Sequence, residues 1–391
     1  MRCTSRRWIE VGALCALALG ATLNLNAARA EETWSLRVEP TLLVDLDARI
    51  YASEAEGLTG FALGRLRPGL SVKPADWVSA TATVEFAGEY ATVYDAYVAL
   101  TPDPSLEVKV GLSKTPLFWS HREPVETLAF PTATAVAQSL RVQRDTGRDL
   151  AVSALWAPEA LPIEVLARVG NGSASFLAND NMELAYYLGL DLVLGRARRG
   201  GTGEAGLRLG VTGVYEHAED RNGITAAHAL GFIYRRSPTV SGDRFVGAAH
   251  LLALYGPFTL LVEGGYADEA RNRDHDGNPA TPRIDLESYV SYGVSAELGW
   301  SFCGRREPSR VRAPGVIDLG LRLERLWVGQ DASDVVPGGG MSATLTAKWW
   351  PTTFMAVSAL GTVIGYDVPA IEDPSRETSW GALVRLSFFA R

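Results

Sequence analysis

Hydrophobic and polar residues alternate one by one along much of this 391-residue chain. In the segment 292–302, tyrosine, valine, alanine, leucine, tryptophan and phenylalanine occupy the even positions, whereas glycine, serine and glutamate occupy the odd ones. The same alternation recurs at 78–86, 106–113, 317–324 and 341–349. Because successive side chains of a β-strand point to opposite faces, each segment predicts a strand with one apolar and one polar face.

The length of these strands and the placement of aromatic residues favour one class of all-β fold. The alternating runs are commonly about ten residues long, whereas strands of soluble sandwiches usually have about five or six. Aromatic residues gather near the predicted strand ends, as in the girdles that flank the lipid-facing band of a membrane barrel. They are Trp77, Tyr94, Trp156, Trp300, Trp327, Trp349, Trp350 and Trp380. We predict an all-β fold, a transmembrane antiparallel β-barrel; the alternative is a soluble sandwich with scattered aromatic core residues.

Turn lengths decide the number of strands. About seventeen segments have strand character, but a bacterial single-chain barrel needs an even number. Short turns and long loops should alternate, and they do so when counted from either end of the chain. The two counts conflict between residues 205 and 254, where the candidate at 226–235 is interpreted as a loop excursion. We therefore predict 16 strands.

Charged residues fall on the polar face of the predicted strands. An arginine or lysine facing lipid near the midplane would cost about 2–4 kcal/mol, so these side chains should face water inside the barrel, which at this size leaves a channel. The basic residues are Arg37, Arg49, Arg65, Arg67, Lys73, Lys109, Arg168, Arg208, Arg322, Lys348 and Arg385. The acidic residues are Glu39, Asp45, Asp47, Glu85, Asp95, Glu107, Glu164, Asp191, Glu297, Asp318 and Glu324.

The segment 115–149 is too long for a plain hairpin loop, and loops of this length are usually functional or disordered. It is rich in basic residues, and Lys114 stands at its base. Folded into the barrel, it would narrow the channel and present cations to a passing anion. The alternative is a surface loop with solvated charges. The candidate residues for the channel lining and this constriction are Lys114, Arg122, Arg141, Arg144, Arg148, Arg65, Arg67, Lys73, Lys109 and Arg168.

The first thirty residues resemble a secretory signal. A basic start is followed by an apolar stretch too short to span a bilayer and by an A-x-A cleavage pattern, which predicts Glu31 as the first mature residue. The barrel is then residues 31–391, exported to the bacterial outer membrane. Only Cys303 remains after cleavage, which excludes an intramolecular disulfide. A net charge of −8 gives no support to a nucleic-acid partner.

Motifs for catalysis, metal or cofactor binding are weak. No G-x-S-x-G element is present, and the five histidines lie far apart in the sequence. The stretch 274–278 hints at a calcium loop, but its glycine comes too early and no glutamate closes the frame. We therefore expect no catalytic residues, no metal and no cofactor. The alternatives to a channel are a non-conducting structural or adhesive barrel and, less favoured, a barrel enzyme.

Several stretches together resemble the phosphate-selective porin O and P family. They are "RLRPGLSVK" (65–73), "DAYVALTPDPSLEVKVGLSKTPL" (95–117), "RDTGRDLAVSALW" (144–156), "RVGNGSASFLANDN" (168–181), "GPFTLLVEGGYA" (256–267) and "LTAKWWPTTFMAVSAL" (345–360). The resemblance implies a sixteen-stranded outer-membrane barrel, often trimeric, that passes anions such as phosphate. The partners it implies are outer-membrane lipid, solutes in transit, the barrel-assembly machinery and a possible homotrimer. In this chain acidic residues on the polar faces nearly match the basic ones, so the expected anion preference is weak.

Overall fold

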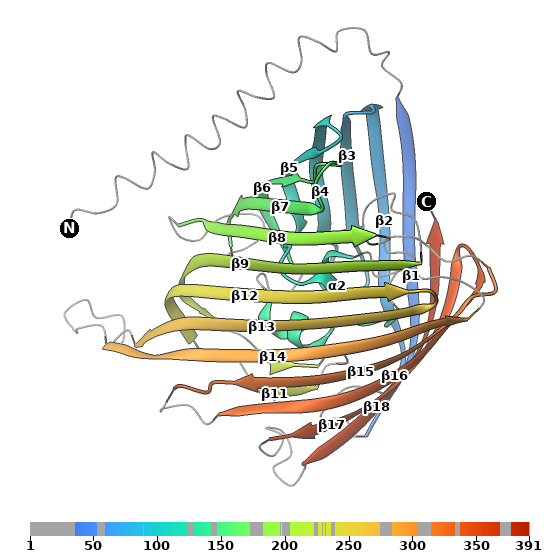
Figure 1. The fold of residues 1–391 in the computed structure, drawn as a ribbon. Helices are drawn as coiled ribbons and strands as arrows, with labels where there is room; N and C mark the ends of the chain where they lie inside the picture. The colour runs from blue at the N-terminus through green and yellow to red at the C-terminus, as the bar shows by residue number, and fades with distance from the viewer. Residues whose placement is uncertain are drawn as a thin grey trace, which may run out of the picture.

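A computed structural model places most of the chain in one closed sheet (Figure 1). The structure describes residues 36–52, 59–88, 90–123, 129–141, 147–172, 183–195, 197, 204–222, 226–228, 230, 232–235, 239–273, 284–302, 314–332, 337–367 and 377–390. The predicted signal, residues 1–30, lies outside the described residues. Within the described residues, no helix is long and apolar enough to cross a membrane.

Sixteen antiparallel strands form the barrel in the described part of the chain, and the strand number predicted from the sequence is confirmed. Each strand pairs with its neighbours along the chain, and β1 pairs with β18 to close the sheet. The strands are β1 (Arg37–Tyr51), β2 (Gly60–Ala75), β3 (Val78–Glu85), β4 (Thr92–Asp103), β5 (Leu106–Lys114), β6 (Arg148–Trp156), β7 (Ile163–Gly170), β8 (Ala185–Gly195), β9 (Ala205–Asn222), β12 (Thr239–Tyr255), β13 (Phe258–Arg273), β14 (Ile284–Phe302), β15 (Ile317–Val328), β16 (Gly338–Thr352), β17 (Met355–Tyr366) and β18 (Thr378–Ala390).

The extra strand candidate at 226–235 is not part of the barrel. Its described residues include two very short strands, β10 (Ala226–Ala227) and β11 (Ile233–Arg235), which pair only with each other. Strand β9 pairs directly with β12 across this excursion. The interpretation of 226–235 as a loop excursion is confirmed.

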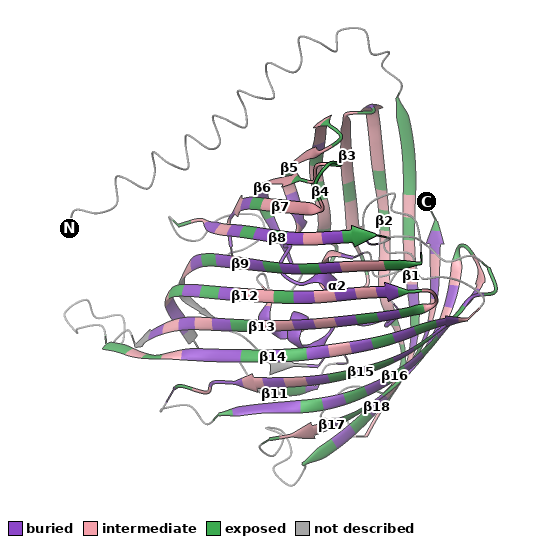
Figure 2. Ribbon diagram, viewed as in Figure 1, coloured by how far each residue is buried: buried purple, intermediate pink, exposed green. Residues whose placement is uncertain are grey.

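Burial alternates along the strands as the sequence predicts (Figure 2). In β14, Tyr292 and Leu298 are 37% and 50% exposed, whereas Ser295 and Glu297 between them are 1% and 4% exposed. Apolar side chains therefore point outward and polar ones inward, which is the reverse of a soluble protein. An apolar outer face with polar residues inside is the pattern of a membrane-spanning β-barrel.

Outward aromatic residues form stacked pairs at two levels of the barrel wall. Phe258 stacks on Trp300 near a short turn, and Tyr292, in the middle of β14, stacks on Trp327 near the end of β15. Eight residues of β14 separate the two pairs, about 27 Å along the strand. After allowance for strand tilt this spacing is close to the apolar band of an outer-membrane barrel, about 25 Å.

Two of the predicted girdle residues face the barrel interior instead. Trp156, Trp300, Trp349 and Trp380 are 41–49% exposed on the outer surface, as expected. Trp350 is 0% exposed, because it follows Trp349 on the same strand and must point the other way. Tyr94 lies inside because the β3–β4 register shifts between Thr83 and Val84, which leaves it as an extra residue. The girdle interpretation is wrong for these two residues.

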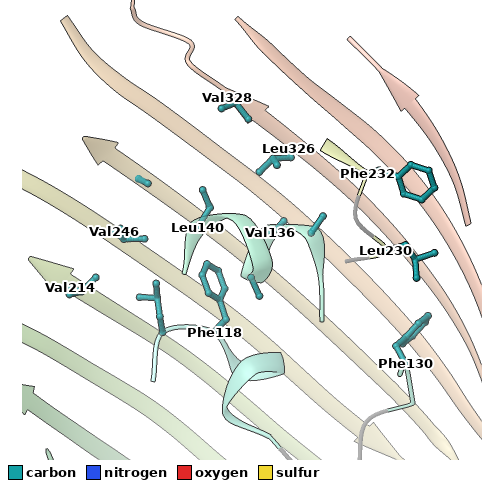
Figure 3. Packing of buried hydrophobic residues seen from close by; sticks show 14 of the residues in the cluster. Phe118, Phe130, Val136, Leu140, Val214, Leu230, Phe232, Val246, Leu326 and Val328 are labelled. Carbon is teal, nitrogen blue, oxygen red and sulfur yellow. The ribbon is translucent and has the colours of Figure 1, made fainter. Parts of the chain in front are cut away.

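The barrel wall is uneven in height. Strands β3, β5, β6 and β7 have eight or nine residues, whereas β9, β12, β13 and β14 have 16 to 19. On the tall side, inward apolar side chains contact the segment after β5 and the excursion around β10 and β11, and together they make a buried cluster. Its members include Phe118, Phe130, Val136, Leu140, Leu230, Phe232, Val246 and Leu326 (Figure 3). The interior of the tall side is thus packed.

Candidate functional site: a cation-lined cavity beside an inward segment

The described residues between β5 and β6 lie inside the barrel. We call the described residues 115–123 and 129–141 the inner segment; it carries two short helices, α2 (Trp119–Arg122) and α3 (Ala135–Leu140). Figure 3 shows both helices beside the inner faces of the strands. Residues 124–128, 142–146 and therefore the candidate Arg144 lie outside the described residues.

Backbone groups of the inner segment are bound by charged side chains from distant strands. Arg322 of β15 donates hydrogen bonds to the carbonyl oxygens of Thr132 and Ala133, at 2.8 and 2.9 Å. Arg385 of β18 donates one to the carbonyl of Pro131, at 2.7 Å. Guanidinium groups that donate to these backbone carbonyls hold the chain in one path across the barrel.

Two glutamates bind backbone N–H groups at the helices of the inner segment. Glu263 of β13 accepts a hydrogen bond from the N–H of Ser120, at 2.8 Å. Glu324 of β15 accepts one from the N–H of Ala135, at the start of α3. The first N–H groups of a helix have no partner within the helix, and a carboxylate there is favourable. Thr134 caps the same helix, since its hydroxyl accepts from the N–H of Ala137.

Arg122 fixes the other end of the inner segment against the wall. Its guanidinium donates to Asp191 of β8 at 2.9 Å, to the hydroxyl of Thr212 of β9, and back to the carbonyl of Pro116. Trp119 packs into an apolar recess that includes Val193 and Leu252. Arg122 therefore acts as a structural tie as well as a charge inside the barrel.

A cavity of about 920 Å³ remains between the inner segment and the short side of the wall. Its lining contains ten lysines and arginines but only four aspartates and glutamates. Eight of the ten candidate residues line it: Lys114, Arg122, Arg141, Arg148, Arg65, Arg67, Lys109 and Arg168. Lys73 does not; it lies toward one mouth, where it makes an exposed ion pair with Glu39.

An arginine–tyrosine–arginine stack stands in the wall of this cavity. The guanidinium carbons of Arg67 and Arg148 lie 3.6 and 3.2 Å from the ring centre of Tyr94. The same arginines pair through their edges with Glu85 and Asp95. Each of these two guanidinium groups therefore has one face against the ring and an ion pair at its edge, and these contacts restrict its movement.

Most of the other cations in the lining also have carboxylate partners. The pairs join Arg65 to Asp45, Arg122 to Asp191, Arg208 to Glu164 and Asp191, Arg385 to Asp45 and Asp47, and Lys109 to Glu107. Lys114 differs, since its ammonium donates to the carbonyl of Glu123 at 2.7 Å and, among the described residues, forms no ion pair. Arg168 is buried and donates to the carbonyls of Ser113, Lys114 and Asp149. The field in the cavity is therefore positive but reduced by these partners.

Two groups of the inner segment have perturbed acidity. Burial holds the pKa of His121 well below its ordinary value, and the nearby cations, Lys114 first, lower it further. His121 is therefore neutral at pH 7. Burial also lowers the pKa of Arg122, and the carboxylate of Asp191 partly opposes that change.

Sequence reasoning missed several residues of the site. Arg208 and Arg385 were placed on the inner face but not among the candidates, although both line the cavity. Glu263 was not singled out at all. The one sequence signal for it is that it lies an even number of residues from other polar positions of β13, and such residues share a face of the strand. The inner position of Phe232 in the excursion had no signal in the periodicity. Among the described residues, no group of three or more His, Cys, Asp or Glu side chains could hold a metal ion.

Comparisons with known proteins point to one class of fold. No protein family model matches the chain, and no curated protein matches its sequence. Solved structures do match. OmpT, an outer membrane protein of Vibrio cholerae, is 11% identical with a TM-score of 0.57, and the match covers 92% of this chain and 100% of that one.

Two further solved structures match over a similar share of both chains. An anion-selective porin from Comamonas acidovorans is 14% identical, with a TM-score of 0.54 and coverage of 91% of this chain and 100% of that one. The outer membrane channel DcaP of Acinetobacter baumannii is 10% identical, with a TM-score of 0.54 and coverage of 91% and 97%. At these identities the matches establish the fold: a sixteen-stranded barrel that resembles those of bacterial outer-membrane proteins.

Proposed function

We propose that this chain is an outer-membrane porin that lets small solutes diffuse through the barrel, with a modest preference for anions such as phosphate. The observation that carries the proposal is the cavity with ten basic and four acidic lining residues beside the inner segment. An excess of fixed positive charge raises the local concentration of anions. The structural likeness to an anion-selective porin supports the same assignment.

The preference for anions is modest because the basic residues are largely neutralised. Arg65, Arg122 and Arg148 each lie 2.9 Å from a carboxylate oxygen. A cation whose partner is fixed at that distance contributes little to the field felt by a passing ion. We accordingly expect weak discrimination between phosphate and other small anions.

The inner segment has the role of the constriction in this proposal. It crosses the barrel between β13, β15 and β18, and it bounds one side of the cavity. The proposal also includes a cleaved signal over residues 1–30, insertion into the outer membrane by the barrel-assembly machinery, and a homotrimer. One of the similar structures is described as a trimer form, which supports the last point.

Planar-bilayer recording of the mature protein tests the proposal. A porin gives stepwise ion conductance, and its reversal potential in a salt gradient has the sign of weak anion preference. Replacing Arg122, Arg141 and Arg144 together with alanine should move the reversal potential toward the cation side. The matched control is Lys73→Ala, which removes a charge outside the cavity. Absence of conductance would refute the porin assignment and favour a structural or adhesive barrel; unchanged selectivity in the triple variant would refute the role of the inner segment.

A further inference from the structure

Two leucines face the cavity where polar residues are expected. Leu155 of β6 and Leu166 of β7 are paired across the two strands. On β6 the outward positions are Leu150, Val152 and Trp156, which are 41–50% exposed, so Leu155 points inward. The inner positions of a channel-forming barrel are usually polar. This pair breaks that pattern.

Nothing in the described protein buries these two side chains completely. Both line the cavity and are only half-buried. Neither belongs to any of the three buried hydrophobic clusters, although other inward apolar residues do. Covering two adjacent apolar side chains that face water with an apolar ligand is favourable, because it removes their surface from water.

A cation with a weakly held partner stands beside the leucine pair. Lys109 lies on β5 opposite Ser153, two residues from Leu155 on the neighbouring strand. Its ammonium pairs with Glu107 at 2.7 Å, but the two side chains are 33% and 35% exposed. Ion pairs between side chains this exposed are weak, because water screens both charges. Lys109 can therefore exchange Glu107 for another carboxylate, unlike the buried arginines.

The next position of the same row has no side chain. Leu166 pairs with Gly189 of β8, where an added Cβ atom would lie 3.1 Å from the Thr212 hydroxyl and 3.6 Å from both the Leu166 Cβ and the Arg122 guanidinium. Trp119 and Arg122 of the inner segment line the same cavity. The leucine pair thus has the Glu107–Lys109 ion pair on its β5 side, with Glu107 directly opposite Leu155, and Gly189 followed by the Thr212 hydroxyl and the Arg122 guanidinium on the other side.

We propose that Leu155, Leu166 and Lys109 form a subsite for organic anions that carry a carboxylate on an apolar body, of which an aromatic carboxylate is the simplest. The inference rests on the proposed porin function and names the solute class for that channel. The carboxylate replaces Glu107 on the Lys109 ammonium, and the apolar body covers the two leucines. Inorganic phosphate satisfies the lysine but leaves the leucines in water, so it binds this subsite less well.

The test is block of chloride conductance by added anions in planar bilayers, with benzoate and acetate as the two probes. Both carry one carboxylate, and they differ in the aromatic ring. For the wild-type channel, half-block should need about tenfold less benzoate than acetate, since cover of the leucine pair removes about 50–60 Å² of apolar surface from water. Phosphate should behave like acetate.

Variants separate the apolar and charged parts of the subsite. In Leu155→Ser/Leu166→Ser the advantage of benzoate over acetate should disappear while chloride conductance remains. The conservative variant Leu155→Met/Leu166→Met should retain it. Lys109→Gln should weaken block by both carboxylates equally, whereas the control Lys73→Gln, outside the cavity, should change neither.

The outcomes for the channel and the subsite are distinguishable. A conducting wild-type protein that benzoate and acetate block at the same concentration overturns the subsite and leaves the porin assignment intact. The same conclusion follows if the serine variant conducts and still favours benzoate. A wild-type protein without conductance overturns the porin assignment and the subsite with it.

Discussion

The attachment of the inner segment to β15 can be broken without leaving the buried Glu297 carboxylate without its arginine. Arg322 is 1% exposed and pairs with Glu297, which is 4% exposed, at 2.8 Å. Replacing Arg322 alone would leave a buried carboxylate without its partner, at a cost of about 3–5 kcal/mol. The double variant Arg322→Met/Glu297→Gln removes both charges at nearly constant volume. What remains is the loss of contact with the inner segment.

That loss can be estimated from the contacts. The Arg322 guanidinium donates three hydrogen bonds to the inner segment, two to Thr132 and one to the carbonyl of Ala133, and lies 4.1 Å from the ring centre of Phe130. At about 1.5 kcal/mol for each bond from a charged donor, the attachment weakens by about 4.5 kcal/mol. A change of that size raises the open fraction of the inner segment roughly a thousandfold.

Amide hydrogen exchange and single-channel recording measure this effect. Exchange over residues 129–141 should accelerate by up to that factor, limited by the other ties to Glu324 and Arg385, while exchange in the barrel strands stays slow. Single-channel conductance should increase and fluctuate. The control Arg325→Met/Asp367→Asn removes an exposed pair that does not contact the inner segment. Unchanged exchange at 129–141 in the double variant would refute the claim that these bonds hold the segment.

Three further predictions concern acidity, the aromatic stack and the leader. Burial holds the pKa of His121 well below about 6.5, so as the pH falls the unfolded chain binds this proton before the folded protein does. The stability that is present above pH 6.5 is therefore lost as the pH falls toward the lower pKa of the folded state. His121→Asn should make the fall in Tm between about pH 7 and 5 less steep. Equal slopes for both proteins would contradict this. Tyr94→Leu removes the ring between two guanidinium groups and should lower the free energy of unfolding by about 1–4 kcal/mol in denaturant titrations. Tyr94→Phe keeps the ring, so its free energy of unfolding should stay close to that of the wild type. An equal loss of stability in both variants would contradict a stabilising role for the ring. Intact-mass measurement of protein from outer membranes should give Glu31 as the first residue, and retention of residues 1–30 would exclude the predicted cleavage.

Local pattern carried most of the fold prediction. Period-two alternation is a property of neighbouring residues, so the inward position of Glu297 and the outward position of Trp300 follow from the sequence alone. The same logic placed Arg65 and Arg168 inside. It failed at Tyr94, because one extra residue in a strand reverses the side chains that follow and no local signal marks the shift.

The site depends on contacts between residues far apart in the sequence. Nothing near Glu324 indicates that it binds the N–H of Ala135, 189 residues earlier. Nothing near Arg385 indicates its bond to Pro131, 254 residues away. The sequence therefore predicted a basic segment of unusual length but not the side chains that bind it.

By itself the sequence determined an all-β chain of alternating strands, sixteen by the parity of its turns, with charges on one face and apolar residues on the other. Only the tertiary structure decided how those charges are distributed. Acidic and basic residues nearly balance along the polar faces, yet closure of the sheet and the path of the inner segment leave ten basic and four acidic residues around the cavity. The physical reason is that alternation sets which face a side chain occupies, whereas its neighbours on that face depend on strand register and on where a long segment can bury its apolar side.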